Sequence, residues 1–330
     1  MTPIRAAEED EGSRRGALAL TLLVAAVLSL GALAVLAAIA GWEPVVDRLR
    51  PLLSYWFAVA FAAEAAAFCA YVLAYRAVAR IEDGPALSLL ESVRFVAVGF
   101  GAFLAKGGAS LDSKALSRGR GGEKAGEARV LALDALEHAP LAPAACAASI
   151  ALLAQGAREP PLDFTIPWAV LVPVGAVLAG IGVRRIDRFR GREGWRGWLG
   201  QVLEGIRILF QLAAQWRRHW LAFVGASVYW AGDVLCLWAS ARAFGAAPGA
   251  GPTILAHAVG YVLTRRTLPL AGAGIVEVLM PLTLVEAGAP FSSAILAVLA
   301  YRVFNLWLPL VPALLALPGA RRALDEPVRA

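Results

Sequence analysis

Nine apolar segments run through this chain of 330 residues, and they decide what it can fold into. Several approach the roughly 20 consecutive apolar residues that a helix needs to cross the hydrocarbon core of a bilayer. A mean hydropathy of +0.65 and a hydrophobic content of 59% exclude a soluble fold. The sequence therefore predicts an all-α polytopic membrane protein. The segments are 16–40, 52–75, 86–105, 129–155, 165–183, 219–244, 253–268, 274–289 and 292–318.

Two pairs of apolar arms meet at glycine breaks. In the later pair, 253–268 and 274–289 are each too short for a full crossing, and Gly272 and Gly274 separate them. In the earlier pair, an arm at 86–105 is followed, after Gly107 and Gly108, by a short return. We expect each pair to form a re-entrant hairpin, which a bilayer tolerates where the backbone is buried in protein or lines a wet cavity. The predicted architecture is about six spanning helices plus two re-entrant hairpins. The hairpins would cover about 86–117 and 253–289.

The two glycine breaks recur at a constant distance along the chain. Gly107 and Gly272 are 165 residues apart, and so are the acids that follow them, Asp112 and Glu277. Glycine-interrupted apolar segments at matching places in two halves are typical of transporters built from inverted repeats, with a binding site near the midplane. The sequence therefore predicts a carrier with an inverted repeat of two halves. Repeat one would cover about 16–155 and repeat two about 165–318.

Basic residues lie mainly on one side of this arrangement. Nine arginines fall within 184–218, whereas the loop 245–252 contains no basic residue. By the positive-inside rule, the arginine-rich side and both termini face the cytoplasm. The net charge of +6 thus indicates orientation and contact with anionic lipid headgroups, not nucleic acid. The expected organisation is a polar cytoplasmic N-terminus (1–15), one transmembrane domain (16–320) and a cytoplasmic tail (321–330).

Within the basic segment 184–218, apolar and charged residues recur at helical spacing. Trp195 and Trp198 belong to the apolar series, and Arg196 and Glu204 to the charged one. Such a pattern is typical of an amphipathic helix that lies in the membrane interface. It is equally typical of a helix that covers the inner face of the bundle, so the pattern leaves both interpretations open.

The hairpins carry the residues best suited to hold a phosphate. Lys106 lies beside the first glycine pair, and Arg265 and Arg266 precede the second. Exposed amide groups and the amino end of a half-helix, next to such cations, can bind a phosphate. Alternatively, the glycines permit tight helix packing, and Asp112 and Glu277 cap the returning helices, contact a polar headgroup or relay protons. The candidate substrate-binding residues are Lys106, Gly107, Gly108, Ser110, Asp112, Arg265, Arg266, Gly272, Gly274, Glu277, Tyr301, Arg302 and Asn305.

Several ionisable residues lie inside or at the edge of apolar segments. A charge in the hydrocarbon region costs about 2.5 to 3.5 kcal/mol on insertion scales, so each such residue needs a partner or a task. Glu137 and Arg302 are again 165 residues apart, and their opposite charges could pair across a pseudo-twofold axis, in function or as a purely structural ion pair. The candidates for an intramembrane charge or proton relay are Glu64, Asp134, Glu137, His138 and Asp233.

Catalytic and metal-binding motifs are missing from the sequence. His138, His219 and His257 are isolated from one another and from any HExxH, GxSxG or P-loop pattern. The three cysteines sit inside apolar runs, as packing residues do. We therefore expect no enzyme activity, no cofactor and no metal.

Two stretches of the second half resemble the bacterial lysylphosphatidylglycerol synthase transmembrane-region family. Its usual pattern is a Pro-rich Gly-Gly-x-Gly turn with a Glu shortly after, then a helix that starts with Tyr-Arg and is broken by Pro. Leu268 to Glu277 and Ala300 to Pro309 follow this pattern, and Lys106 to Asp112 resembles the family's first Gly-rich motif more loosely. Ala271 replaces a common glycine and Lys106 a usual proline, which leaves the substrate open. The matching residues are Gly272, Gly274, Glu277, Tyr301 and Arg302.

The resemblance implies a function in lipid handling. Family members joined to a soluble aminoacyl-transfer domain make lysyl-phosphatidylglycerol, and the membrane region is implicated in moving that lipid between leaflets. This sequence carries no such soluble domain, so we expect a flippase-like translocator of the bacterial inner membrane, acting on a phospholipid or polyprenyl-phosphate-linked lipid. The alternatives are an intramembrane lipid aminoacyl- or glycosyltransferase with Asp134, Glu137 or Glu277 as base, and a non-catalytic membrane partner of a separately encoded transferase. A homo-oligomer also stays open.

Overall fold

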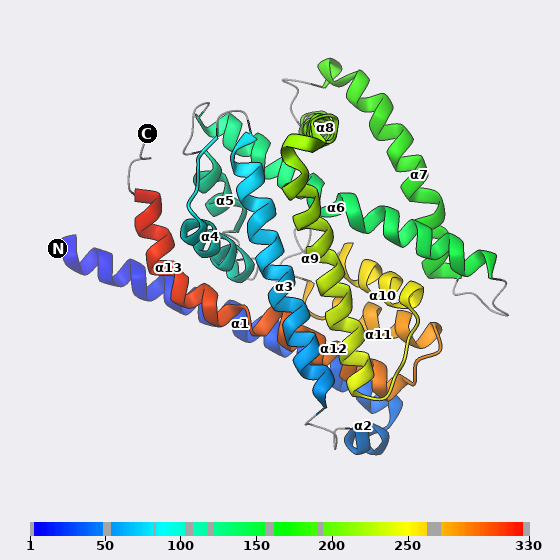
Figure 1. Ribbon diagram of the computed structural model, residues 1–330. Helices are drawn as coiled ribbons and strands as arrows, with labels where there is room; N and C mark the ends of the chain where they lie inside the picture. The colour runs from blue at the N-terminus through cyan, green and yellow to red at the C-terminus, as the bar shows by residue number, and fades with distance from the viewer. Residues whose placement is uncertain are drawn as a thin grey trace.

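The computed structural model describes eight stretches of the chain, and every element in them is a helix (Figure 1). Six helical segments are long and apolar enough to cross a bilayer, which confirms the predicted fold class. The described stretches are 3–48, 54–81, 84–102, 108–117, 122–155, 162–189, 194–262 and 272–325. The helices are α1 (Pro3–Ala40), α2 (Trp42–Arg48), α3 (Tyr55–Ala79), α4 (Leu89–Ala102), α5 (Gly108–Leu116), α6 (Gly122–Ala154), α7 (Leu162–Arg184), the 3₁₀ helix η2 (Ile186–Arg188), α8 (Gly194–Ala214), α9 (Trp216–Ala243), α10 (Ala250–Val262), α11 (Val276–Glu286), α12 (Phe291–Arg302), the π-helix η4 (Val303–Trp307) and α13 (Leu310–Asp325).

The six candidate spans coincide with the six segments expected to cross. They are provided by α1, α3, α6, α7, α9 and the continuous run from α12 to α13. The most apolar window of 18 residues in α7 buries none of its residues against the rest of the chain, whereas half of the corresponding window in α9 is buried. Apolar side chains such as Leu171 and Val177 of α7 therefore face outward, where a bilayer would solvate them.

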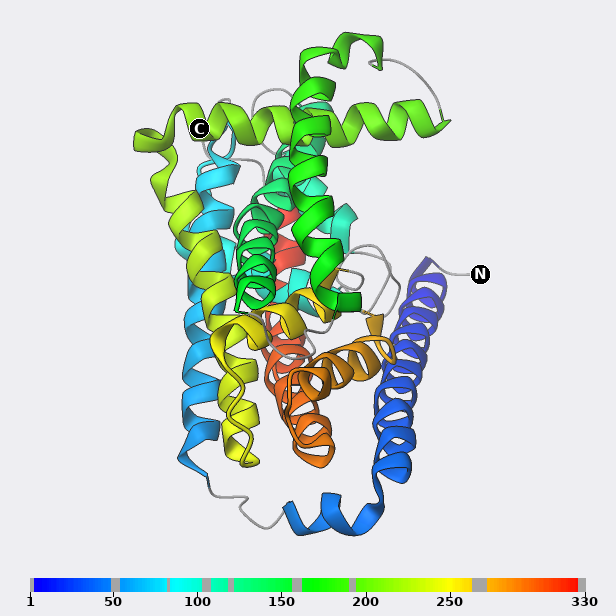
Figure 2. The ribbon, with the colours of Figure 1, turned by 90° about the vertical axis from the view of Figure 1, so that its right-hand side faces the viewer.

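The antiparallel pair α3 and α9 makes the most extensive contact between two helices in the described part of the chain (Figure 1), and the pair lies along one side of the bundle in Figure 2. Small residues let the two backbones approach closely, as is common between membrane helices. A Cβ atom added to Gly232 would lie 2.6 Å from the carbonyl oxygen of Ala63, and one added to Gly225 would lie 2.6 Å from that of Ala70. This contact turns the mid-helix acids of both helices toward the interior.

Two pairs of short helices occupy the regions predicted to form hairpins. The helices α4 and α5 have 14 and 9 residues, and α10 and α11 have 13 and 11. At 1.5 Å per residue none of them reaches the roughly 30 Å of a hydrocarbon core. The tips at 103–107 and 263–271 lie outside the described residues, so the re-entrant course itself stays a prediction.

The same order of long and short helices occurs twice along the chain. In each half a long helix is followed by two short ones and then by another long segment. The helices α3 and α9 run in opposite directions, as do α6 and the run from α12 to α13 (Figures 1 and 2). This arrangement is consistent with the predicted inverted repeat, which likewise stays a prediction.

The amphipathic helix predicted in the basic segment is α8, which lies across one end of the bundle (Figure 2). Leu203, Ile208 and Leu212 are buried on its inner face. Trp195 and Trp198 are 68% and 65% exposed on its outer face. The helix therefore covers the bundle with one face, and its other face has the exposed tryptophans typical of a membrane interface.

Candidate functional site

A buried polar cluster joins three helices near the middle of the bundle. Nε2 of His257 in α10 lies 3.1 Å from Oδ2 of Asp233 in α9 and 3.2 Å from the hydroxyl of Tyr301 in α12. The side chains of His257 and Asp233 are fully buried, and so is Tyr301. A buried carboxylate and imidazole are expensive unless they are paired, so this contact is a specific feature and not a chance encounter.

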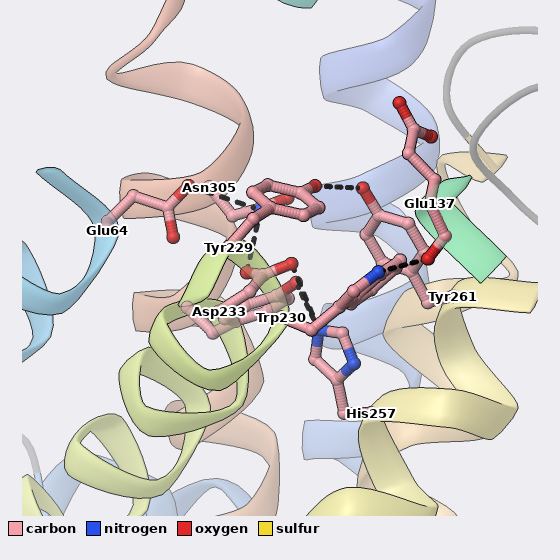
Figure 3. Close-up of polar contacts among 9 residues, drawn as sticks. Glu64, Glu137, Tyr229, Trp230, Asp233, His257, Tyr261 and Asn305 are labelled. Carbon is pink, nitrogen blue, oxygen red and sulfur yellow. Dashed lines mark hydrogen bonds and ion pairs between the residues drawn. The ribbon is translucent and has the colours of Figure 1, made fainter. Parts of the chain in front are cut away.

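Asn305 extends the cluster to a fourth helix (Figure 3). Its amide Nδ2 donates to Oδ1 of Asp233 at 2.9 Å and lies 3.4 Å from Oε1 of Glu64 in α3. Asn305 belongs to the π-helix η4, a local widening of the helix that often accompanies functional sites. Residues from both halves of the chain thus meet around one amide group.

A second polar unit lies at the turn before α11. Gly272 and Gly274 have positive φ angles of 66° and 90°, which side chains with a Cβ rarely adopt. The backbone N–H of Gly274 donates to Oε2 of Glu277 at 2.8 Å, and Nε of Arg302 donates to Oε1 of the same carboxylate at 2.7 Å. Glu277 therefore caps the turn and pairs with Arg302 at once, and the ion pair holds α11 against α12.

Glu137 has other partners than the predicted Arg302. The hydroxyl of Tyr71 donates to Oε1 of Glu137, and the indole N–H of Trp230 donates to its backbone carbonyl. Arg302 is paired with Glu277 instead, because α11 and not α6 presents an acid to it. The proposed pairing across a pseudo-twofold axis therefore does not describe this structure.

Aromatic rings separate Glu137 from the Asp233 cluster. The hydroxyls of Tyr229 and Tyr261 lie 2.7 Å apart, and Trp230 packs edge-on against both His257 and Tyr261 (Figure 3). His257 and Tyr261, one helical turn apart in α10, are stacked with 16° between their ring planes. This packing fixes the orientation of the imidazole.

An apolar cleft of about 750 Å³ lies on the other side of Trp230. It runs between α6, α9 and α10, and its walls include Leu141, Val234 and Ile254. Leu235 in the same wall is 41% exposed, so the cleft is open toward the surroundings of the bundle. The indole ring of Trp230 thus contacts both the apolar cleft and the polar cluster.

The structure brings together only part of the predicted site. Asp112 is buried in α5 beside Gly99, whereas the contacts described for the Asp233 cluster come from α3, α9, α10, α12 and η4. His138 is exposed, and its Nδ1 lies 2.8 Å from the backbone carbonyl of Asp134 in the same helix. This contact does not join His138 to the Asp233 cluster. Gly108 and Ser110 lie at the start of α5. Lys106, Gly107, Arg265 and Arg266 lie outside the described residues.

His257 was missed, because along the sequence it looks isolated. The structure corrects this interpretation: the residue contacts Asp233 and Tyr301, which are 24 and 44 positions away. One local signal could have indicated it, since His257 and Tyr261 are four residues apart and therefore share a face of an otherwise apolar helix.

Comparison with known proteins gives one match. The family model described as "Lysylphosphatidylglycerol synthase TM region" matches residues 22–313, which include all of the clusters described above. Neither the curated proteins nor the solved structures contain a match to this chain.

Proposed function

Since the chain belongs to the lysylphosphatidylglycerol synthase transmembrane-region family, a membrane domain linked to lipid handling, we propose that it moves a phospholipid or a polyprenyl-phosphate-linked lipid between the two leaflets. The observation that supports this proposal best is the buried polar cluster next to an apolar cleft. A lipid has the same two parts, a polar headgroup and apolar chains, and it must carry both through the bilayer.

In this proposal the acyl chains occupy the cleft while the headgroup passes the polar cluster. The cleft lies between α6, α9 and α10, so a chain can remain in contact with the hydrocarbon of the membrane. The headgroup phosphate is assigned to the cations beside the glycine breaks, Lys106, Arg265 and Arg266. Amide groups exposed at a break in a helix, together with such cations, suit a phosphate.

The orientation follows from the arginine-rich end of the bundle. We propose that α8 lies on the cytoplasmic face of the bacterial inner membrane, with both termini on that side. A polar cleft of about 420 Å³ between α3, α8 and α9 is lined by Arg80, Arg218 and His219. Anionic lipid headgroups at the cytoplasmic surface are the proposed partners of this cleft. A second copy of the chain and a separately encoded lipid-modifying transferase are further proposed partners.

The experiment is leaflet exchange in vesicles that contain the purified full chain. A fluorescent phospholipid is placed in both leaflets, and a membrane-impermeant quencher then reports how fast the inner-leaflet lipid becomes accessible. We expect exchange well above that of protein-free vesicles, with the labelled lipid chemically unchanged. A new lipid product would support the transferase alternative, and exchange no faster than in protein-free vesicles would overturn the proposal.

A matched pair of variants ties the exchange to the cleft. Val234→Trp places a large ring in the wall of the cleft, whereas Leu171→Trp places the same ring on the outer face of α7. We expect the first variant to slow exchange at least several-fold and the second to leave it unchanged. If both variants exchange lipid at the same rate, the acyl chains do not use this cleft.

A further inference from the structure

The imidazole of His257 occupies a position in which no single protonation state satisfies all of its neighbours. Its Nε2 faces two groups at once, Oδ2 of Asp233 and the hydroxyl of Tyr301. Its other nitrogen, Nδ1, is buried without a hydrogen-bond partner among the residues that the structure describes. A neutral imidazole carries one proton and a charged one carries two, so the state of the ring decides which contacts are made.

Two states of this group each satisfy part of the contacts. With the proton on Nε2, the neutral ring donates to Asp233, and Nδ1 stays a bare acceptor. In the charged ring, Nε2–H pairs with the carboxylate of Asp233, but Nδ1–H becomes a buried donor without a described partner. The attraction of the ion pair and the cost of the unsatisfied donor oppose each other. The protonation state of the ring therefore depends on the balance between these two effects.

Protonation at this site changes contacts between several helices. Asp233 also accepts from Asn305, which reaches toward Glu64, so its charge affects the contact of α9 with η4 and α3. Tyr301 connects the same imidazole to α12. The site thus lies where helices of both halves meet, and η4 interrupts the regular helix at that level.

Other titratable groups face the imidazole and its immediate partners. Tyr261 in α10 is stacked on the ring, and its hydroxyl contacts that of Tyr229 in α9. Glu64 in α3 lies near Asn305, which donates to Asp233, and Cys236 in α9 packs in the same core cluster as Tyr301. Glu137 in α6 accepts from Tyr71 in α3, and Glu277 and Arg302 pair with each other. Among the residues that the structure describes here, only His257 and Asp233 form a direct contact between an imidazole and a carboxylate.

We propose that His257, Asp233 and Tyr301 form a proton-binding site inside the bundle, and that a proton bound there changes the packing of α9, α10 and α12. The ligand is the proton alone, taken up from water or given back to it, with no covalent bond formed or broken. Its coupling to lipid movement rests on the proposed function, whereas the binding of the proton does not.

The small number of histidines makes the site measurable without any lipid assay. The chain has three histidines, so isotope-labelled imidazole nitrogens give three pairs of signals in magnetic resonance spectra of the full chain in detergent micelles, and each pair is counted below as the signal of one histidine. His257→Gln removes and thereby assigns one signal, and His219→Gln, at the start of α9, is the matched control. The signal of His257 is followed from about pH 5 to pH 8, and we expect it to report the uptake of a proton by the ring. We also expect the isosteric Asp233→Asn and the conservative Tyr301→Phe to shift its midpoint by about one pH unit or more, with the signal of His219 unmoved.

The outcomes separate this proposal from the proposed function. If His257 keeps one protonation state across this range, or titrates with the same midpoint in Asp233→Asn and Tyr301→Phe, there is no proton-binding site of this kind. In vesicles that show leaflet exchange, a pH difference across the membrane should change the rate at least threefold in the wild type but not in His257→Gln. If the rate of exchange in the wild type does not depend on the pH difference, the proposed coupling between protonation and lipid movement is wrong. If no exchange occurs at all, the lipid proposal fails, and the titration of His257 still decides whether the proton site exists.

Discussion

Nε of Arg302 donates to Oε1 of Glu277 at 2.7 Å, and the two side chains are 5% and 0% exposed. Because the carboxylate also accepts from the backbone of Gly274, this ion pair joins α12 to the glycine turn before α11. This buried charge contact links the two helices, and its members come from the two family-like stretches of the sequence.

Loss of Arg302 should destabilise the fold. Arg302→Ala leaves the buried carboxylate of Glu277 without its cation, which typically costs about 3 to 5 kcal/mol. The free energy of unfolding in detergent measures this effect. The double variant Glu277→Gln with Arg302→Ala should be less destabilised than the sum of the two single changes, because the uncompensated charge is gone. Strictly additive effects would mean that the pair does not act as a unit.

The turn before α11 should tolerate no side chain. Gly274→Ala forces a residue with a Cβ into a backbone conformation at φ 90°, at a cost of about 1 to 2 kcal/mol. Thermal unfolding of the variant in detergent measures the loss. Gly288→Ala, at a similar φ of 92° in the connection that follows α11, is a control for the strain alone. If only Gly274→Ala slows leaflet exchange, the turn has a role beyond folding.

Close packing of α3 against α9 should fail when Gly232 is enlarged. A Cβ there would lie 2.6 Å from a backbone oxygen of Ala63, which cannot move as the end of a flexible side chain can. Overpacking of this kind costs typically about 1 to 3 kcal/mol. Gly175→Ala in α7, where an added Cβ meets nothing within 4 Å, should not lower the stability, because alanine favours a helix more than glycine does. An unchanged free energy of unfolding in Gly232→Ala would contradict the helix contact.

The side-chain amide of Asn305 should be needed for stability, because it donates a hydrogen bond to Asp233. Asn305→Leu removes the donor to Asp233 and leaves that buried carboxylate with fewer hydrogen bonds, which costs about 1 to 3 kcal/mol. Replacement by Asp adds a third acid near Glu64 and Asp233 and should be worse still. Thermal stability in detergent should therefore fall in the order Asn, Leu, Asp. A more stable aspartate variant would contradict the donor role of this residue.

Much of this fold could be predicted from the sequence. The number and approximate positions of the six spans follow from hydropathy, because the transfer free energy of a helix into hydrocarbon is the sum over its own residues. The conformations of Gly272 and Gly274 are local as well, because a positive φ depends on the residue itself. The amphipathic pattern of α8 likewise identified a helix with one buried face.

Partners were harder to predict than elements. Glu64, Asp233 and Asn305 were recognised as costly intramembrane groups, but the sequence gave no reason to place them around one amide. Arg302 could be matched with Glu137 by its spacing, yet it pairs with Glu277. His257 looked like an isolated residue in an apolar run, although it lies at the centre of the cluster.

The sequence by itself therefore determined which parts of this chain enter a membrane and where the chain must turn. Only the tertiary structure decided that His257 meets Asp233 and Tyr301, and that Trp230 contacts both this cluster and an apolar cleft. The physical reason is that burial in hydrocarbon and backbone conformation are properties of single segments. Hydrogen bonds between helices depend on which faces meet, and the small residues of α3 and α9 fix that choice only once the whole bundle has packed.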